Sequence, residues 1–248
     1  MKATITHKNQ TFSVDLLRPI DISIPLKDGE NPLAWYIDKP TISPVRSEDW
    51  VGKVSEGGDV NFNTITFNPH AHGTHTECAG HITEKVHSIN EHLTQFFFMT
   101  EIVTVASERR GEDSVISKKQ LQYDLNGKTP EALVIRTLPN TQDKKTKNWS
   151  HTNWTYIEES AMVFLRNCGV KHLLIDLPSV DREKDEGELK AHKAFWDVDG
   201  TIRMDATITE MIYVPHQIED GTYLLNLQIA SFDNDATPSK PVLYKIES

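Results

Sequence analysis

The pattern that most constrains the fold is an apolar strand, an amphipathic helix and a second apolar strand in direct succession. Residues 132–137 are typical of one buried strand and residues 170–176 of another. Between them, apolar residues recur at helical spacing up to Cys168, after Thr155 and Glu158, which have the spacing of a capping box. Two strands joined in this way are expected to be parallel, with a right-handed crossover. The chain is therefore predicted to have an α/β fold.

Most of the remaining predicted elements are strands. Their apolar patterns place them at 11–17, 19–26, 60–67, 96–106, 221–230 and 242–246. A short helix is expected after Ser117, whose hydroxyl suits an N-cap. The segment 27–60 is irregular and holds several prolines, glycines and aromatic residues. Long segments of this kind are more often functional than accidental, so we expect it to wall a pocket.

Composition limits the class of protein. The chain has 248 residues, of which 38% are apolar, so it can bury a large core, and we expect a single domain over residues 1–248. A formal net charge of −10 would repel a phosphate backbone, which argues against a nucleic-acid partner. Two cysteines are too few for a disulfide framework, and no apolar run has the length of a signal peptide or membrane span. These features predict a cytoplasmic protein with no membrane partner.

A cluster of potential metal ligands lies between residues 70 and 81. It holds four of the eleven histidines and one carboxylate: His70, His72, His75, Glu77 and His81. Imidazole and carboxylate groups suit Zn²⁺, Mn²⁺ and Fe²⁺. If this stretch is extended, His75, Glu77 and His81 share one face, because side chains in a strand alternate. We predict a metal site here.

A catalytic metal site needs further ligands from distant elements. Asp176 and Asp181 follow a predicted strand, at the edge where α/β folds keep their sites. His192 and Glu210 come later in the chain. Each also suits a structural role, His192 on an exposed helix face and Glu210 as a capping or solvated residue. These residues are candidates to complete the site.

The cluster resembles the signature of the cyclase family of metal-dependent hydrolases, which includes bacterial kynurenine formamidase and isatin hydrolase. That signature is His-x-Gly-Thr-His-x-Asp-x-Pro-x-His, and this chain has Gly73-Thr74-His75-x-Glu77-x-x-x-His81. Further similarities follow in the same order: Asp21-Ile-Ser-Ile-Pro-Leu, Trp35, Val134-Ile-Arg-Thr, Ile175-Asp-Leu-Pro-Ser-Val-Asp181, Ala191-His192 and Glu210. Glu77 and Ala79 replace the aspartate and proline of the signature. The resemblance covers most of the chain.

The resemblance implies roles for these residues. It implies that the acid of the signature bridges two metals, and that the downstream histidine and glutamate hold the second one. The metal ligands would be His70, His75, Glu77, His192 and Glu210. The first histidine of the signature falls on Ala71, so either His70 or His72 serves, and we favour His70, with His72 lining the pocket. His81 would transfer protons, and the cofactor would be Zn²⁺ or Mn²⁺, with one or two ions per chain.

The resemblance also implies a mixed, barrel-like β-sheet core with flanking helices, in a homodimer or homotetramer. The expected substrate is a small molecule, most simply an aryl formamide such as N-formylkynurenine. Trp35 and Tyr36 would stack against its ring. A lactone or cyclic imide hydrolase, or a non-catalytic metal-binding member of the fold, are the alternatives.

Overall fold

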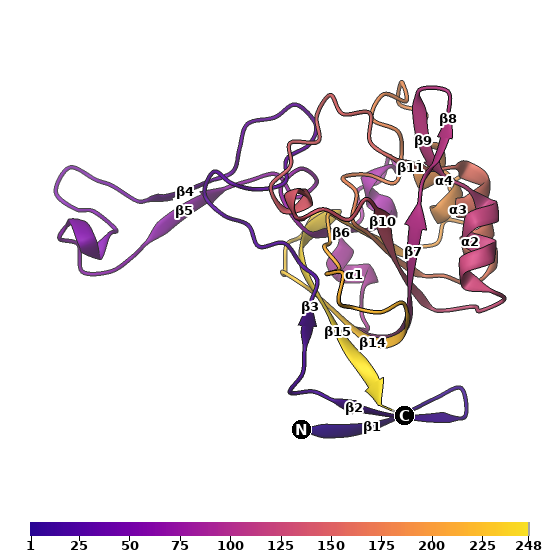
Figure 1. Cartoon of the computed structure of the whole chain (residues 1–248). Coiled ribbons are helices and arrows are strands. Elements are labelled where there is room, and N and C mark those ends of the chain that lie inside the picture. The colour runs from indigo at the N-terminus through magenta and orange to yellow at the C-terminus, as the bar shows by residue number, and fades with distance from the viewer. Residues whose placement is uncertain (248) are drawn as a thin grey trace.

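A mixed sheet forms the centre of the molecule (Figure 1). The computed structural model describes residues 1–247. Within them, seven strands pair in a closed ring, since the last pairs again with the first: β6 (His75–Glu77), β13 (Thr207–Glu210), β12 (His172–Ile175), β10 (Ala132–Leu138), β7 (Phe97–Ala106), β14 (Gly221–Ile229) and β15 (Ala236–Glu247). The fold is α/β with a barrel-like core, as predicted.

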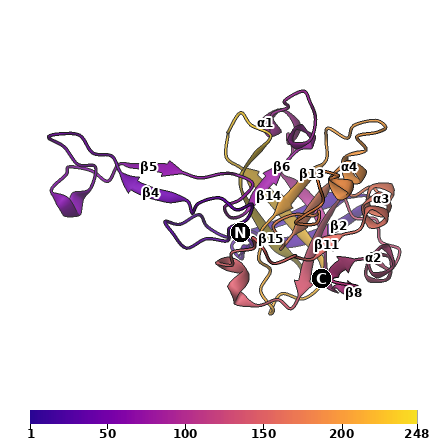
Figure 2. The ribbon, with the colours of Figure 1, turned by 90° about the horizontal axis from the view of Figure 1, so that it is seen from above.

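The strand–helix–strand unit has the predicted topology. β10 pairs in parallel with both β7 and β12, and β12 pairs in parallel with β13. α3 (Glu159–Asn167) connects β10 to β12. It lies with α2 (Lys118–Leu125) and α4 (Lys190–Trp196) on one side of the sheet, whereas α1 (Ile89–His92) lies apart from them (Figures 1 and 2). Four neighbouring parallel strands thus end at one edge of the barrel.

The core has two parts because the strands are buried on both faces. On β10, Leu133 and Ile135 pack in the cluster that includes Met162 and Leu165 of α3. Val134, between them, packs in the other cluster with residues from β12, β14 and β15. This explains why these strands have continuous apolar sequences.

The start of α3 differs from the prediction. Tyr156–Ile157 form a short strand, β11, which pairs with β9 (Asp113–Ile116) beside β8 (Glu108–Arg110). The Glu158 carboxylate accepts hydrogen bonds from the Lys118 amide and the Ser160 hydroxyl, and it makes no capping-box bond. The capping box predicted at Thr155 is therefore wrong. The cap predicted at Ser117 is confirmed, with Gln120 completing a capping box.

An arm projects from the body opposite the three helices (Figures 1 and 2). Its strands are β4 (Thr41–Pro44) and β5 (Asn63–Thr66), and η1 (Val54–Glu56) lies beyond them. In the described residues, β4 and β5 pair only with each other. All residues of β5 are exposed. The strand predicted at 60–67 is thus shorter than expected and lies outside the barrel, because its only partner is β4.

The other elements lie at the edges of the barrel. β1 (Lys2–His7) and β2 (Gln10–Asp15) form a hairpin on the end of β15, and β3 (Ile20–Asp21) pairs with the middle of β15. Two short 3₁₀ turns are η2 (Ala79–His81) and η3 (Gln142–Lys145). In the described part of the chain, no helix is long and apolar enough to cross a membrane.

Candidate metal centre

The strand that closes the barrel carries the centre of the site. β6 is hydrogen-bonded to β13 on one side and to β15 on the other, and Glu210 of β13 lies directly opposite His75. His75 and Glu77 point to the same side of β6, since they are two residues apart. Both are buried. The short strand β6 therefore places an imidazole and a carboxylate side by side in a buried position.

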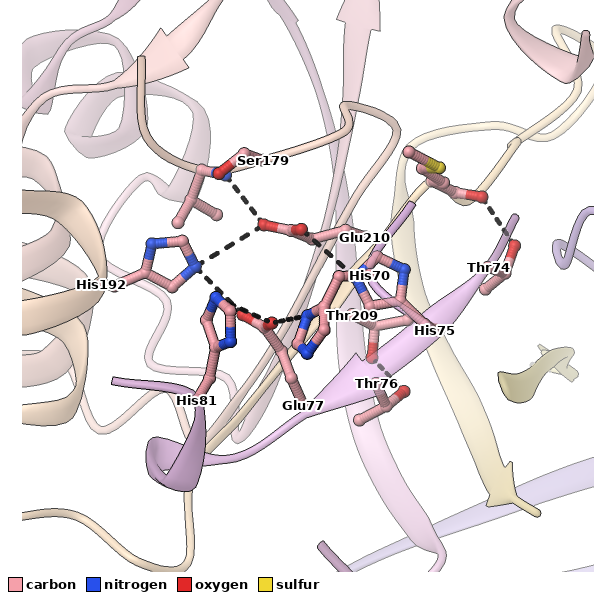
Figure 3. Close-up of polar contacts among 12 residues, drawn as sticks. His70, Thr74, His75, Thr76, Glu77, His81, Ser179, His192, Thr209 and Glu210 are labelled. Atoms are coloured by element: carbon pink, nitrogen blue, oxygen red, sulfur yellow. Dashed lines mark hydrogen bonds and ion pairs between the residues drawn. The ribbon is translucent and has the colours of Figure 1, made fainter. Parts of the chain in front are cut away.

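Glu77 lies at the middle of four histidines (Figure 3). Its Oε1 is 3.0 Å from His192 Nε2, and its Oε2 is 3.0 Å from His70 Nδ1 and 3.9 Å from His81 Nε2. Burial raises the pKa of Glu77, but His81, His192 and His70 outweigh this effect and hold the pKa well below its usual range. The carboxylate is kept ionised, and each of its two oxygens faces a different histidine.

Glu210 joins two of the same histidines from the other side. Its Oε2 is 3.4 Å from His75 Nε2, and its Oε1 is 3.8 Å from His192 Nε2. The Val180 amide donates a hydrogen bond to Oε1 over 2.9 Å, which fixes the carboxylate. The predicted ligands His70, His75, Glu77, His192 and Glu210 are thus brought together.

The hydrogen bonds of the His75 ring indicate whether a cation fits at its Nε2. Its Nδ1 lies 3.1 Å from the Gly73 carbonyl oxygen and must donate to it, so the neutral ring has a lone pair on Nε2. That Nε2 is buried and has no hydrogen-bond partner among residues 1–247. It faces a Glu210 oxygen, which is also electron-rich. A buried lone pair opposite a carboxylate is costly alone and is satisfied by a bound cation, so these residues fit a divalent metal.

A second carboxylate orients His192. The Nδ1 of His192 is 2.6 Å from Asp181 Oδ2. Asp181 also accepts a hydrogen bond from the backbone amide of Ala191 at the start of α4. Burial lowers the pKa of His192, but the bonds to Asp181 and Glu77 outweigh it and raise the pKa well above its usual value. A carboxylate on the far ring nitrogen is the usual support of a metal-binding histidine. Asp181 is the carboxylate that supports His192 in this way, whereas the sequence showed it only as a carboxylate at a strand end.

Sequence reasoning missed Asp235. Its Oδ2 is 2.8 Å from His70 Nε2 and 3.3 Å from His81 Nδ1, and the His70 and His81 rings stack with centroids 4.1 Å apart. Burial lowers the pKa of His70, but Asp235 and Glu77 raise it to about 10. Asp235 is the last residue before β15. In the sequence, 233–235 is typical of an ordinary turn, and only the pairing of β15 with β6 brings it to the site.

The structure separates His70 from His72. His70 lies in the cluster, whereas His72 accepts a hydrogen bond from the Asn68 amide and donates one to the Asp38 carbonyl oxygen. Both ring nitrogens of His72 are therefore engaged by the backbone. The geometry supports His70 as the first ligand, while the pocket-lining role of His72 stays a prediction.

Trp35 and Tyr36 lie on the loop before the arm. The Trp35 ring packs edge-on against Trp154, with centroids 5.0 Å apart, and the Tyr36 hydroxyl donates to Glu183 over 2.8 Å. Both residues have positive φ values of 63° and 61°, a conformation that costs about 1–3 kcal/mol each and is concentrated at functional sites. Tyr36 also packs against the His151 ring, with centroids 4.6 Å apart. Within residues 1–247, no hydrogen bond or ring contact joins Trp35 or Tyr36 to the histidines around Glu77, so their stacking role stays a prediction.

A closed mixed sheet places several histidines around one buried carboxylate, a set of donor groups that fits a divalent metal. The chain belongs to the cyclase family: the family described as "Putative cyclase" matches residues 20–182. The kynurenine formamidase of Bacillus cereus is 25% identical over 236 residues, which span 94% of this chain and 97% of that protein.

Solved structures share the fold at lower identity. A potential metal-dependent hydrolase with cyclase activity superposes with a TM-score of 0.66 at 16% identity, covering 93% of this chain and 99% of that one. Isatin hydrolase A from Labrenzia aggregata, bound to benzyl benzoate, has a TM-score of 0.65 at 12% identity and covers 93% and 94% of the two chains. The predicted family and fold are confirmed.

Proposed function

We propose that this chain is a metal-dependent hydrolase of a small amide, an arylformamidase that releases formate from N-formylkynurenine or a similar aryl formamide. The observation that carries the proposal is the unpaired, buried Nε2 of His75 opposite Glu210, beside the histidine-bound Glu77. The similarity to kynurenine formamidase along almost the whole chain supports the amide substrate.

The metal is proposed to be Zn²⁺ or Mn²⁺, held by His70, His75, Glu77, His192 and Glu210. When bound, a divalent metal polarises a carbonyl group and lowers the pKa of water toward ~7. The two oxygens of Glu77 face His70 and His192 separately, so these residues would suit one or two ions. Asp181 orients His192 toward the same point.

His81 is proposed to move the proton to the leaving nitrogen. Its side chain is 31% exposed, whereas that of Glu77 is 1% exposed, so it can reach both solvent and the buried carboxylate. Its Nε2 lies 3.9 Å from Glu77 Oε2. General acid–base catalysis of this kind contributes a factor of about 10²–10⁴. Trp35 and Tyr36 are proposed to bind the aromatic ring of the substrate.

Two other readings use the same residues. The structural similarity to isatin hydrolase A favours a cyclic amide or imide as a second candidate substrate, because the same carbonyl chemistry opens a ring. A non-catalytic metal-binding protein is the other alternative. We further propose that the protein is cytoplasmic and forms a homodimer or homotetramer.

A turnover panel tests the proposal. Purified, metal-loaded protein is offered N-formylkynurenine, isatin, a simple lactone and a cyclic imide, with His75→Ala as the matched inactive control. We expect the highest kcat/KM on the formamide and none with the variant. A higher kcat/KM on isatin or the lactone would show that the aryl formamide is not the preferred substrate. Full metal occupancy without turnover of any compound would support the non-catalytic alternative.

A further inference from the structure

Asp235 is fixed to the strand that carries Glu77. Its carbonyl oxygen accepts a hydrogen bond from the Cys78 amide over 3.0 Å, and the next residue, Ala236, lies opposite Glu77 in the β6–β15 pairing. The side chain is 20% exposed, and its contacts are with His70 and His81. The backbone thus holds this carboxylate in place on the open side of the site.

His70 lies between two carboxylates. Its Nδ1 is 3.0 Å from Glu77 Oε2, and its Nε2 is 2.8 Å from Asp235 Oδ2. His192 has the same arrangement on the other oxygen of Glu77, with Nε2 3.0 Å from Oε1 and Nδ1 2.6 Å from Asp181. A histidine that binds a metal through one ring nitrogen usually donates the other to a carboxylate. Asp235 therefore occupies, for His70, the position that Asp181 occupies for His192.

His70 needs such support more than the other predicted ligands do. It lies in a turn, not in β6, and its backbone amide donates a hydrogen bond to the Asn68 side chain over 2.9 Å. Ala71 stands where the family signature has its first histidine, so His70 reaches the site from one residue further away. Nothing in the strand pairing fixes the orientation of its ring.

We propose that Asp235 is the positioning residue of the first metal ligand: it accepts the Nε2 proton of His70 and thereby turns Nδ1 toward Glu77 and the metal. The same carboxylate oxygen also contacts Nδ1 of His81, so one residue orients both a metal ligand and the proposed proton carrier. This inference rests on the proposed metal centre, and its test uses metal binding in the absence of substrate.

The experiment is a titration of metal-free protein with Mn²⁺ and Zn²⁺, followed by calorimetry. Asp235→Asn keeps the shape of the side chain but removes its charge and half of its acceptor capacity. We expect the same number of ions at saturation and a Kd raised about 10- to 100-fold. Asp233→Asn, an exposed aspartate two residues upstream, is the matched control and should leave the Kd unchanged. Asp181→Asn is the positive control.

A double-mutant cycle separates positioning from a general effect on the fold. In a His70→Ala background, Asp235→Asn should change the Kd less than about two-fold, because its partner is gone. In a His81→Ala background, the full loss should remain. Equal losses in both backgrounds, or a wild-type Kd for Asp235→Asn, would overturn the proposal.

Two further outcomes are distinct. Loss of one whole equivalent of metal at saturation would make Asp235 a direct ligand and would also overturn the positioning role. If the wild type turns over no substrate but the metal titrations behave as expected, the proposed hydrolase activity fails and this inference stands. A wild type that binds no metal overturns both.

Discussion

His75 and Glu210 face each other across the pairing of β6 and β13, with His75 Nε2 3.4 Å from Glu210 Oε2. Among residues 1–247, that nitrogen has no hydrogen-bond partner. Strand register places them there, since directly opposite residues in an antiparallel pair point to the same side. The Gly73 carbonyl oxygen decides which ring nitrogen of His75 carries the proton. Two electron-rich atoms therefore face each other at a distance that fits a cation between them.

Replacing His81 should separate chemistry from metal binding. We expect His81→Ala to keep the wild-type number of metal ions and to lose about 10²- to 10⁴-fold in kcat, because a proton carrier is removed and the ligands stay. Metal analysis and steady-state kinetics on the same preparation check this. A large fall in metal content would show instead that His81 is a ligand.

Trp35 should affect substrate binding and not the metal. We expect Trp35→Ala to raise KM for an aryl formamide roughly 3- to 10-fold, which corresponds to the loss of one aromatic contact. Trp35→Phe keeps a ring and is the matched control. An unchanged KM in both variants would remove Trp35 from the substrate site.

Because His172 is buried, we predict that the free energy of unfolding falls in acid, independently of the metal. It is buried on β12, packs against the Phe98 ring with centroids 3.9 Å apart, and is 2.9 Å from the Thr207 hydroxyl. Burial lowers its pKa to about 4, below the unfolded value of about 6.5. Between pH 6.5 and pH 4, the unfolded chain binds a proton on His172 that the folded protein does not bind. The contribution of neutral His172 to the free energy of unfolding is therefore complete above pH 6.5 and is lost as the pH falls toward 4.

The effect is roughly 3 kcal/mol over the whole window. His172→Gln cannot titrate, so its deficit in thermal stability relative to the wild type should be largest at pH 7 and should shrink at pH 5. Thermal unfolding of metal-free protein at both pH values measures this. A deficit of the same size at both would contradict the assignment.

We predict that two copies of this chain associate through the arm. Phe62 and Ile65 are 56% and 51% exposed on a hairpin whose strands, within residues 1–247, pair only with each other. An isolated two-stranded hairpin is marginally stable in water. We expect a second copy of this chain to cover these residues. Light scattering should give the mass of a dimer or tetramer, and a Phe62→Ser, Ile65→Ser variant should shift it toward the monomer. A monomeric wild type would contradict the expectation.

The parts of the fold that were predictable share a strong local pattern. β10, α3 and β12 were evident because buried parallel strands have continuous apolar sequences and the helix between them has its own period. β5 was misplaced because the alternation around Phe62 and Ile65 is the same whether a strand joins a barrel or an arm. Sequence periodicity does not say which partner a strand has.

The same limit applies to the site. His75, Glu77, His192 and Glu210 could be proposed because they match a motif of known order. Asp235 could not, since its place depends on β15 returning beside β6 from the far end of the chain. The choice between His70 and His72 also depended on geometry, because a turn directs adjacent rings to different surroundings.

Elemental analysis of purified protein beside its His75→Ala variant shows whether the cluster around Glu77 is a metal centre. We expect one or two Zn²⁺ or Mn²⁺ ions per wild-type chain. In the variant, metal affinity should fall by more than the roughly 10- to 100-fold typical of a residue that only supports a ligand. A wild type that holds no divalent metal after incubation with either ion, or a variant that holds as much as the wild type, would contradict it.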